Sequence, residues 1–69
     1  MMDSVYKIIE IVGTSESSWE DAAKTALDTA AKTIQDIRIA EVNKLDIKID
    51  EKGNPIFRAR LNVSFKYRS

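Results

Sequence analysis

The chain has 69 residues, 43% of them hydrophobic and 32% charged, and its 11 basic side chains balance its 11 acidic ones. This composition predicts one globular domain over residues 1–69, and zero net charge leaves no overall field to attract nucleic acid or an anionic membrane. Because cysteine and histidine are both absent, disulfides, thiolate nucleophiles, imidazole bases and zinc sites are excluded, and any bound metal is expected to be a hard cation on oxygen ligands.

The first predicted element is a strand over residues 5–12 (VYKIIEIV), which the Gly13-Thr14-Ser15 segment is expected to end. Its apolar side chains occupy both faces: Val5, Ile9 and Ile11 on one, and Tyr6, Ile8 and Val12 on the other. A strand of this kind is expected to meet protein on both faces, as it would at a contact between subunits.

A helix is predicted to begin near Ser18. Ser17 followed three residues later by Glu20 has the capping-box pattern, and Glu20 and Asp21 place negative charge where the helix dipole favours it. The apolar face has three-and-four spacing and is mostly alanine: Trp19, Ala22, Ala23, Ala26, Leu27, Ala30, Ala31 and Ile34. Small side chains let a helix approach a sheet closely but bury little apolar area, so one protomer is not expected to be stable alone.

A second strand is predicted over residues 37–50, followed by a Gly53-Asn54-Pro55 turn. Its apolar positions share odd numbers: Ile37, Ile39, Leu45, Ile47 and Ile49. Glu41 and Asn43 break this alternation. A β-bulge that resets the alternation is the preferred interpretation, and the alternative is that Glu41 is a buried carboxylate with a specific partner.

The third predicted strand, over residues 55–68, alternates apolar odd positions with polar even ones. It would run on the order of 45 Å, whereas a compact chain of this length has a diameter of about 28 Å. Something outside the protomer must therefore cover the strand ends, and other copies of the same chain are the expected cover.

The third strand carries a basic row at Arg58, Arg60, Lys66 and Arg68. Antiparallel strands that share an apolar face must pair with an even residue sum, which places Asp46 opposite either Arg58 or Arg60. We interpret the basic row as a solvated or salt-bridged sheet face rather than a nucleic-acid site, because stacking aromatic residues are missing from it.

The sequence contains no recognisable catalytic set, so we do not expect an enzyme. Residues 13–18 precede the helix as a phosphate-binding loop would, but they lack the glycines and lysine of a P-loop, and helix capping is preferred. Residues 50–54 superficially suggest a calcium loop, yet tight-turn chemistry explains them as well. Neither a signal peptide nor a membrane span is predicted, so a cytoplasmic location is expected.

The order of elements and several short motifs resemble the dodecin family over nearly the whole chain. The motifs are Val5-Tyr6-Lys7, Gly13-Thr14-Ser15, Ser18-Trp19-Glu20, Ala40-Glu41-Val42 and Val63-Ser64-Phe65. The resemblance implies an α+β fold of β-α-β-β order, with a three-stranded antiparallel sheet partly wrapped around one helix. It also implies a hollow homododecamer that stores or sequesters a flavin such as riboflavin or flavin mononucleotide (FMN).

Two departures from the family bear on ligand binding. Flavin-binding dodecins have a tryptophan in the second strand that stacks on the ring and a glutamine in the third that hydrogen-bonds it. The matching positions here are Ile39 and Arg58. The Asp36-Ile37-Arg38 and Ser64-Phe65-Lys66 segments are more similar to the calcium dodecin branch.

Three ligand hypotheses follow from the resemblance: a calcium-binding cage, a flavin-storing cage with an atypical pocket, and a purely structural cage. Glu41, Asp46 and Asp50 are the candidate ligands for calcium or magnesium. Since one chain offers few acids for six to eight oxygens, a cation site is expected where symmetry-related copies converge.

Overall fold

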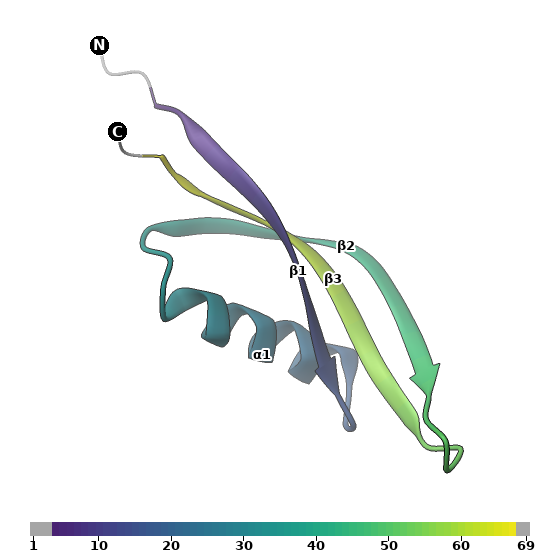
Figure 1. The fold of residues 1–69 in the computed structure, drawn as a ribbon. Coiled ribbons are helices and arrows are strands. Elements are labelled where there is room, and N and C mark those ends of the chain that lie inside the picture. Colours follow the sequence, from purple (N-terminus) through teal and green to yellow (C-terminus); the bar gives the residue numbers. More distant parts are fainter. Residues whose placement is uncertain (1–3, 68–69) are drawn as a thin grey trace.

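The computed structural model describes residues 4–67. It contains β1 (Tyr6–Ser15), α1 (Trp19–Ala31), β2 (Ile37–Ile49) and β3 (Pro55–Lys66), as Figure 1 shows. The strands form one antiparallel sheet in the order β1-β3-β2, with α1 on one face. The predicted α+β class and β-α-β-β order are confirmed.

The described part of the chain is elongated. It measures 55 × 21 × 16 Å, and its radius of gyration of 14.3 Å exceeds the roughly 11 Å of a compact chain of this length. The 13-residue helix α1 covers only about 20 Å, so the β2–β3 hairpin extends past it at one end (Figure 1). The sheet is therefore longer than the part of it that α1 covers, as predicted.

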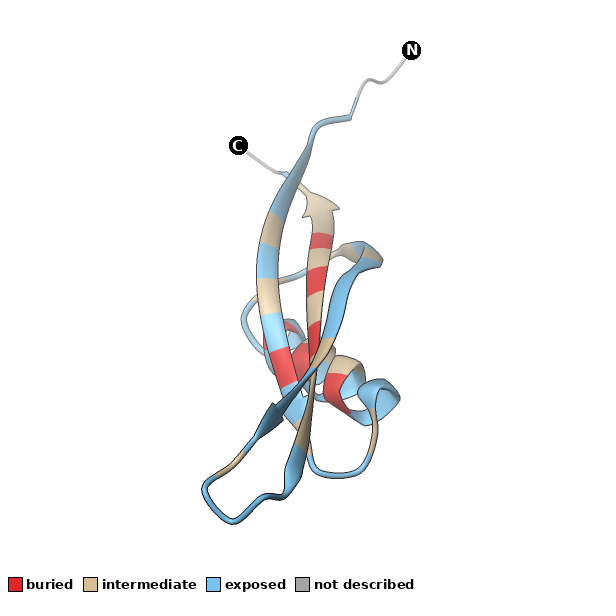
Figure 2. Cartoon of the chain, turned by 90° about the vertical axis from the view of Figure 1, so that its right-hand side faces the viewer, coloured by how far each residue is buried: buried red, intermediate tan, exposed pale blue. Residues whose placement is uncertain are grey.

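The core is small and rich in alanine. Its buried apolar residues are Ala22, Ala26, Ala30, Ala59, Leu61 and Val63. Figure 2 shows that the buried positions gather where α1 crosses the sheet. Of the described residues, only Leu61 and Val63 are large and fully buried, and the apolar area that one protomer removes from water is correspondingly small.

Gly13 lies inside β1, which continues to Ser15, so the prediction that this segment ends the strand was wrong. A Cβ at Gly13 would lie 2.0 Å from the carbonyl oxygen of Ala22 and 2.8 Å from the Cβ of Ala26. The glycine therefore serves close packing of β1 against α1 rather than strand termination.

The cap of α1 is one residue later than predicted. Ser18 is the N-cap, and its Oγ accepts a hydrogen bond from the backbone N–H of Asp21 at 3.0 Å. The hydroxyl of Ser15 accepts a bond from the backbone N–H of Ser17 at 2.9 Å, so Ser17 belongs to the preceding turn. The helix ends at Ala31, before Ile34.

The pairing of β2 with β3 places Asp46 opposite Arg58, one of the two predicted registers. The register shifts between Val42 and Lys44, and again between Ile37 and Ile39. The first shift is the predicted bulge, which leaves Asn43 unpaired in the ladder. Because Glu41 is exposed, the alternative of a buried carboxylate was wrong. β3 ends at Lys66, and the predicted strand residue Arg68 lies outside the described residues.

Within one protomer β1 is covered on one face only. Ile9 and Ile11 pack against the core, whereas Tyr6, Ile8 and Val12 are at least half exposed. The prediction that both faces meet protein is therefore not met inside the protomer. The uncovered side belongs to the open face, by which we mean the sheet face opposite α1.

Candidate functional site

The open face carries nearly all the candidate polar residues. The buried odd-numbered residues of β3 face α1, so its even-numbered residues and their partners in β1 and β2 lie on the open face. Three successive rows cross it from β1 through β3 to β2: Glu10–Asn62–Glu41, Val12–Arg60–Lys44 and Thr14–Arg58–Asp46. Acidic and basic side chains thus meet in the middle of the sheet.

Asp46 and Arg58 form a bidentate ion pair in the third of these rows. The guanidinium Nε and Nη2 of Arg58 donate to the two carboxylate oxygens of Asp46 at 2.6 and 2.7 Å. These hydrogen bonds hold the pKa of Asp46 below its usual value, against a smaller opposing effect of desolvation, and raise the pKa of Arg58. The pair therefore stays ionised at neutral pH, joined by two charge-assisted hydrogen bonds.

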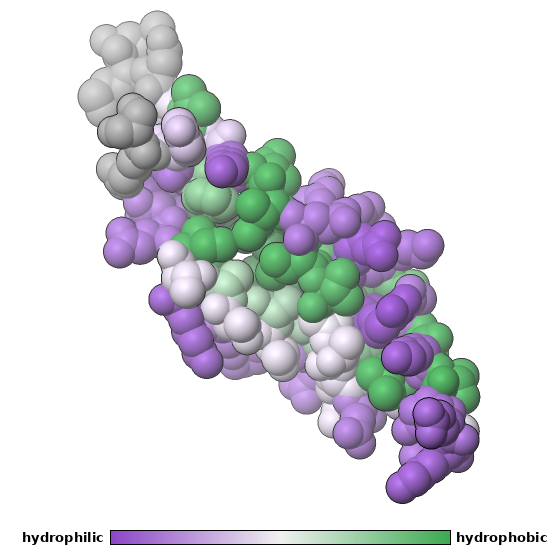
Figure 3. Space-filling view, in the orientation of Figure 1, coloured by the Kyte–Doolittle hydropathy of each residue, from purple (hydrophilic) through white to green (hydrophobic). Residues whose placement is uncertain are grey.

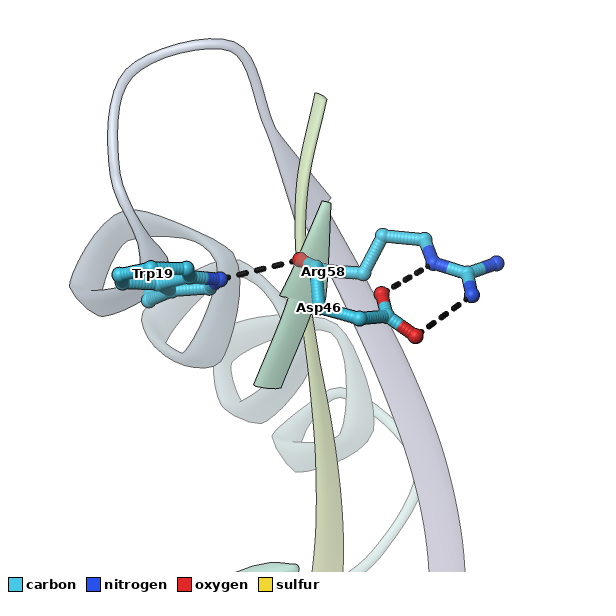
Figure 4. A network of polar contacts seen from close by, with 3 residues as sticks. All are labelled: Trp19, Asp46 and Arg58. Carbon is cyan, nitrogen blue, oxygen red and sulfur yellow. Dashed lines mark hydrogen bonds and ion pairs between the residues drawn. The ribbon is translucent and has the colours of Figure 1, made fainter. Parts of the chain in front are cut away.

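Trp19 joins this pair to the helix. Its indole Nε1 donates to the main-chain carbonyl of Asp46 at 3.0 Å, and its ring meets Phe57 edge-on with centroids 5.3 Å apart. Figure 4 shows Trp19 on the helix side of the strands and the Asp46–Arg58 pair on the other side. From the sequence, Trp19 is expected only on the apolar face of the helix. The indole N–H, which usually finds a partner when partly buried, was the available signal.

The bulge residue Asn43 reaches across β3 to β1. Its Nδ2 donates to a carboxylate oxygen of Glu10 at 3.1 Å, and the other oxygen of Glu10 lies 4.0 Å from Nε of Arg60. The basic row of β3 is therefore salt-bridged at Arg58 and Arg60, as predicted. The Asn43–Glu10 contact was not predicted, although the break in alternation at Asn43 marked the position.

The two candidate flavin positions are far apart in one protomer. Ile39 lies opposite Ser64 near one end of the open face and is 66% exposed. The bulge in β2 puts Ile39 on the opposite face from Leu45, so the predicted common apolar face of these residues was wrong. Arg58 lies opposite Asp46, about 20 Å away along the strand at roughly 3.3 Å per residue. The structure does not bring Ile39 and Arg58 together, so a pocket that used both would need a second copy. Ile8 flanks Ser64 on its other side and is 65% exposed.

The candidate metal ligands are also separated. Glu41, Asp46 and Asp50 follow one another along β2 and its end, at spacings of about 13–16 Å. Among residues 4–67 no group of three or more acidic side chains is placed to hold a metal ion. A site built from these residues would require other copies.

Asp50 organises the β2–β3 turn. Its carboxylate accepts bonds from the backbone N–H groups of Lys52 at 2.9 Å and Asn54 at 2.8 Å. The bond from Asn54 contributes most to lowering the pKa of Asp50. The tight-turn interpretation of residues 50–54 therefore accounts for the role of Asp50 in this protomer.

An elongated antiparallel sheet laid over one alanine-rich helix, with a charged open face, defines a small α+β protein with little core of its own. The dodecin family model matches residues 5–68, and the chain belongs to the dodecin family. In the described part of the chain, no helix is long and apolar enough to cross a membrane.

Two relatives cover almost the whole chain. The calcium dodecin of Mycobacterium tuberculosis is 48% identical over 94% of this chain and 92% of its own length, and the dodecin of Thermus thermophilus is 38% identical over 94% of both chains. The crystal structure of the first, described as calcium-chelating with a novel calcium-binding site, superposes with a TM-score of 0.87 over 94% of this chain and 93% of that one. The Streptomyces coelicolor dodecin, at 23% identity, shares the fold with a TM-score of 0.90 over 100% of this chain and 99% of that one.

Proposed function

We propose that this chain is a single domain that assembles into a homododecameric cage and binds a small ligand without catalysing a reaction. The observation that carries the proposal is the amount of apolar surface that one protomer leaves uncovered. Among residues 4–67, eleven large hydrophobic residues are exposed: Val5, Tyr6, Ile8, Val12, Trp19, Ile39, Val42, Leu45, Ile47, Ile49 and Tyr67. Figure 3 shows part of this apolar surface, and surface of this extent favours burial against other copies.

The β2 strand supplies much of this surface on the helix side. Leu45 and Ile47 lie opposite Ala59 and Phe57 of β3, yet they remain 45% and 44% exposed. These apolar side chains are only partly buried within the protomer. In the proposed cage they pack against a second copy of the same chain.

Calcium is the first ligand that we propose for the cage. The 48% identical relative is named calcium dodecin, and Glu41, which is exposed on the open face, offers a carboxylate for a site shared between copies. Asp46 and Asp50 remain candidates, although each would have to exchange its present hydrogen-bond partners for the cation. A carboxylate site of this kind suits calcium or magnesium.

A flavin-storing cage is the second candidate function. Ile39 offers an exposed apolar wall on the open face but no aromatic plane, so riboflavin or FMN would lose the stacking that tryptophan provides. Arg58 is already engaged by Asp46 and does not reproduce the hydrogen bonds of a glutamine. We therefore expect flavin binding to be weak, and a purely structural cage is the outcome if neither ligand binds.

Native mass spectrometry combined with calcium calorimetry tests the proposal. A mass of twelve chains and saturable calcium binding are expected, with binding lost or weakened in Glu41→Ala. A stable folded monomer at micromolar concentration would contradict the cage. A dodecamer that binds no calcium but quenches riboflavin fluorescence would favour the flavin alternative.

A further inference from the structure

A small hollow on the open face has an unbalanced positive charge. It has a volume of about 30 Å³ and is lined by Val12, Lys44, Asp46, Arg58 and Arg60, which is room for one water-sized group. Three of these side chains are cations and one is an acid. Asp46 pairs with Arg58 and Glu10 with Arg60, so Lys44 is the cation of the hollow that has no ion pair among the described residues.

The placement of Lys44 is the first observation that favours a bound anion in this hollow. Lys44 lies directly opposite Arg60 across the β2–β3 ladder, and like charges in that position destabilise a sheet. The other neighbour of Arg60 is Val12, so this row contains no acid. Glu10 approaches Arg60 only to 4.0 Å, and its second oxygen accepts the bond from Asn43.

The Asp46–Arg58 pair is the second observation that favours a bound anion in this hollow. Asp46 uses both carboxylate oxygens on Nε and Nη2 of Arg58, so it interacts with Lys44 and Arg60 only as a nearby charge and not through a hydrogen bond. The same two bonds fix the guanidinium plane at the edge of the hollow, and the third nitrogen of Arg58 is turned away from Asp46 (Figure 4). A guanidinium held in this way keeps free N–H donors for an oxyanion without further ordering.

We propose that the hollow among Lys44, Arg58 and Arg60 binds a phosphate group, either as inorganic phosphate or at the end of a small phosphomonoester. One phosphate oxygen fits the hollow. The group's negative charge would balance Lys44, and its oxygens would accept further hydrogen bonds from Arg58 and Arg60. The site uses neither Ile39 nor Glu41. It shares Arg58 with the candidate flavin positions, but it needs no flavin ring, so it goes beyond the proposed calcium and flavin functions. It also leaves Asp46 paired with Arg58 rather than free to bind a cation.

Isothermal titration of the intact protein with inorganic phosphate, in a buffer without other oxyanions, tests this site. Lys44→Gln and Arg60→Gln should each weaken phosphate binding by about ten-fold, because each removes one charge-assisted contact. Lys48→Gln is the matched control, since Lys48 lies on the same strand and has the same charge but does not line the hollow. Circular dichroism and native mass would show that the variants keep their fold and assembly.

Glycerol phosphate and acetate complete the titration. Glycerol phosphate should bind as inorganic phosphate does if the site accepts monoesters, whereas binding of the inorganic ion alone would assign the site to free phosphate. Acetate should bind much more weakly because it carries one charge. Equal weakening by Lys48→Gln, acetate binding as tight as phosphate, or no binding at millimolar phosphate would overturn the proposal. So would dissociation of the assembly by Lys44→Gln without any phosphate binding, because the hollow would then hold a carboxylate of another copy.

Discussion

The indole N–H of Trp19 donates to the main-chain carbonyl of Asp46, 27 residues further along the chain, at 3.0 Å. This bond fastens the first turn of α1 to the middle of β2, on the opposite side of the sheet from the Asp46–Arg58 ion pair (Figure 4). It matters because α1 otherwise packs mainly on β1 and β3 through alanine side chains. The helix and the charged open face are thus linked through a single residue of β2.

Trp19→Phe should lower the free energy of unfolding by about 1 kcal/mol, because it removes this hydrogen bond and keeps most of the ring. Urea unfolding of the assembled protein at fixed concentration measures the change. Lys24→Gln is a suitable control, since Lys24 is exposed and paired only with Asp28 one helical turn away. If Trp19→Phe lowers the free energy of unfolding no more than the control does, the hydrogen bond contributes nothing to stability.

Gly13→Ala should destabilise the protein by more than about 3 kcal/mol or prevent folding, because the new methyl group would overlap the backbone of α1. Gly53→Ala is the comparison. Gly53 has φ +85° but nothing within 4 Å of a Cβ, so only the conformational cost of about 1 kcal/mol is expected. Thermal unfolding of both variants should give clearly different losses. Similar losses would mean that β1 and α1 are less closely packed than described.

Acidic pH should destabilise the wild-type protein more than Asp46→Asn. The pKa of Asp46 is lower in the folded state than its usual 3.8, so its ion pair stabilises the fold above that pH, and the contribution disappears as pH falls through the folded-state pKa. The melting temperature of the wild type should therefore drop more steeply between pH 5 and pH 2 than that of the variant. Parallel curves for the two proteins would contradict this assignment.

Ile39→Trp combined with Arg58→Gln should create flavin binding with strong quenching of riboflavin fluorescence. The wild type should bind at least about ten-fold more weakly, since a stacked aromatic pair contributes of the order of 0.5–1.5 kcal/mol beyond burial. Native mass must show that the double variant keeps its assembly. Nanomolar riboflavin binding by the wild type, or no gain in an intact double variant, would show that the pocket lies elsewhere.

Thermal stability should rise with protein concentration if unfolding is reversible. In the described part of one protomer only two large side chains, Leu61 and Val63, are fully buried. Most apolar burial is therefore expected between copies, and dissociation should accompany unfolding. Calorimetric scans over a hundred-fold range of concentration measure the dependence. A melting temperature independent of concentration would argue that the protomer is stable alone.

Local patterns in the sequence were sufficient to predict the elements and to limit the register of β2 against β3 to two possibilities, one of which is observed. Alternation along residues 55–66 predicted β3 and its buried Ala59, Leu61 and Val63 correctly, because side chains in a strand alternate between faces with a period of two. The same period made the break at Asn43 a signal for the bulge. The cap and end of α1 were displaced by one to three residues, because neighbouring serines compete for the cap and several residues near the end could extend the apolar face.

Contacts between distant segments could be decided only in three dimensions. Gly13 looked like a strand breaker because sequence proximity does not show that the backbone of α1 lies against it. The bridge from Asn43 to Glu10 crosses an intervening strand. Lys44 meets Arg60 in one of the two predicted registers, and only the structure shows which of the two is formed. The sequence by itself therefore determined the elements, the two faces of β3 and the need for cover, since these follow from local periodicity and composition. The tertiary structure decided which charges are paired and which are left facing one another, because pairing depends on strand order and register.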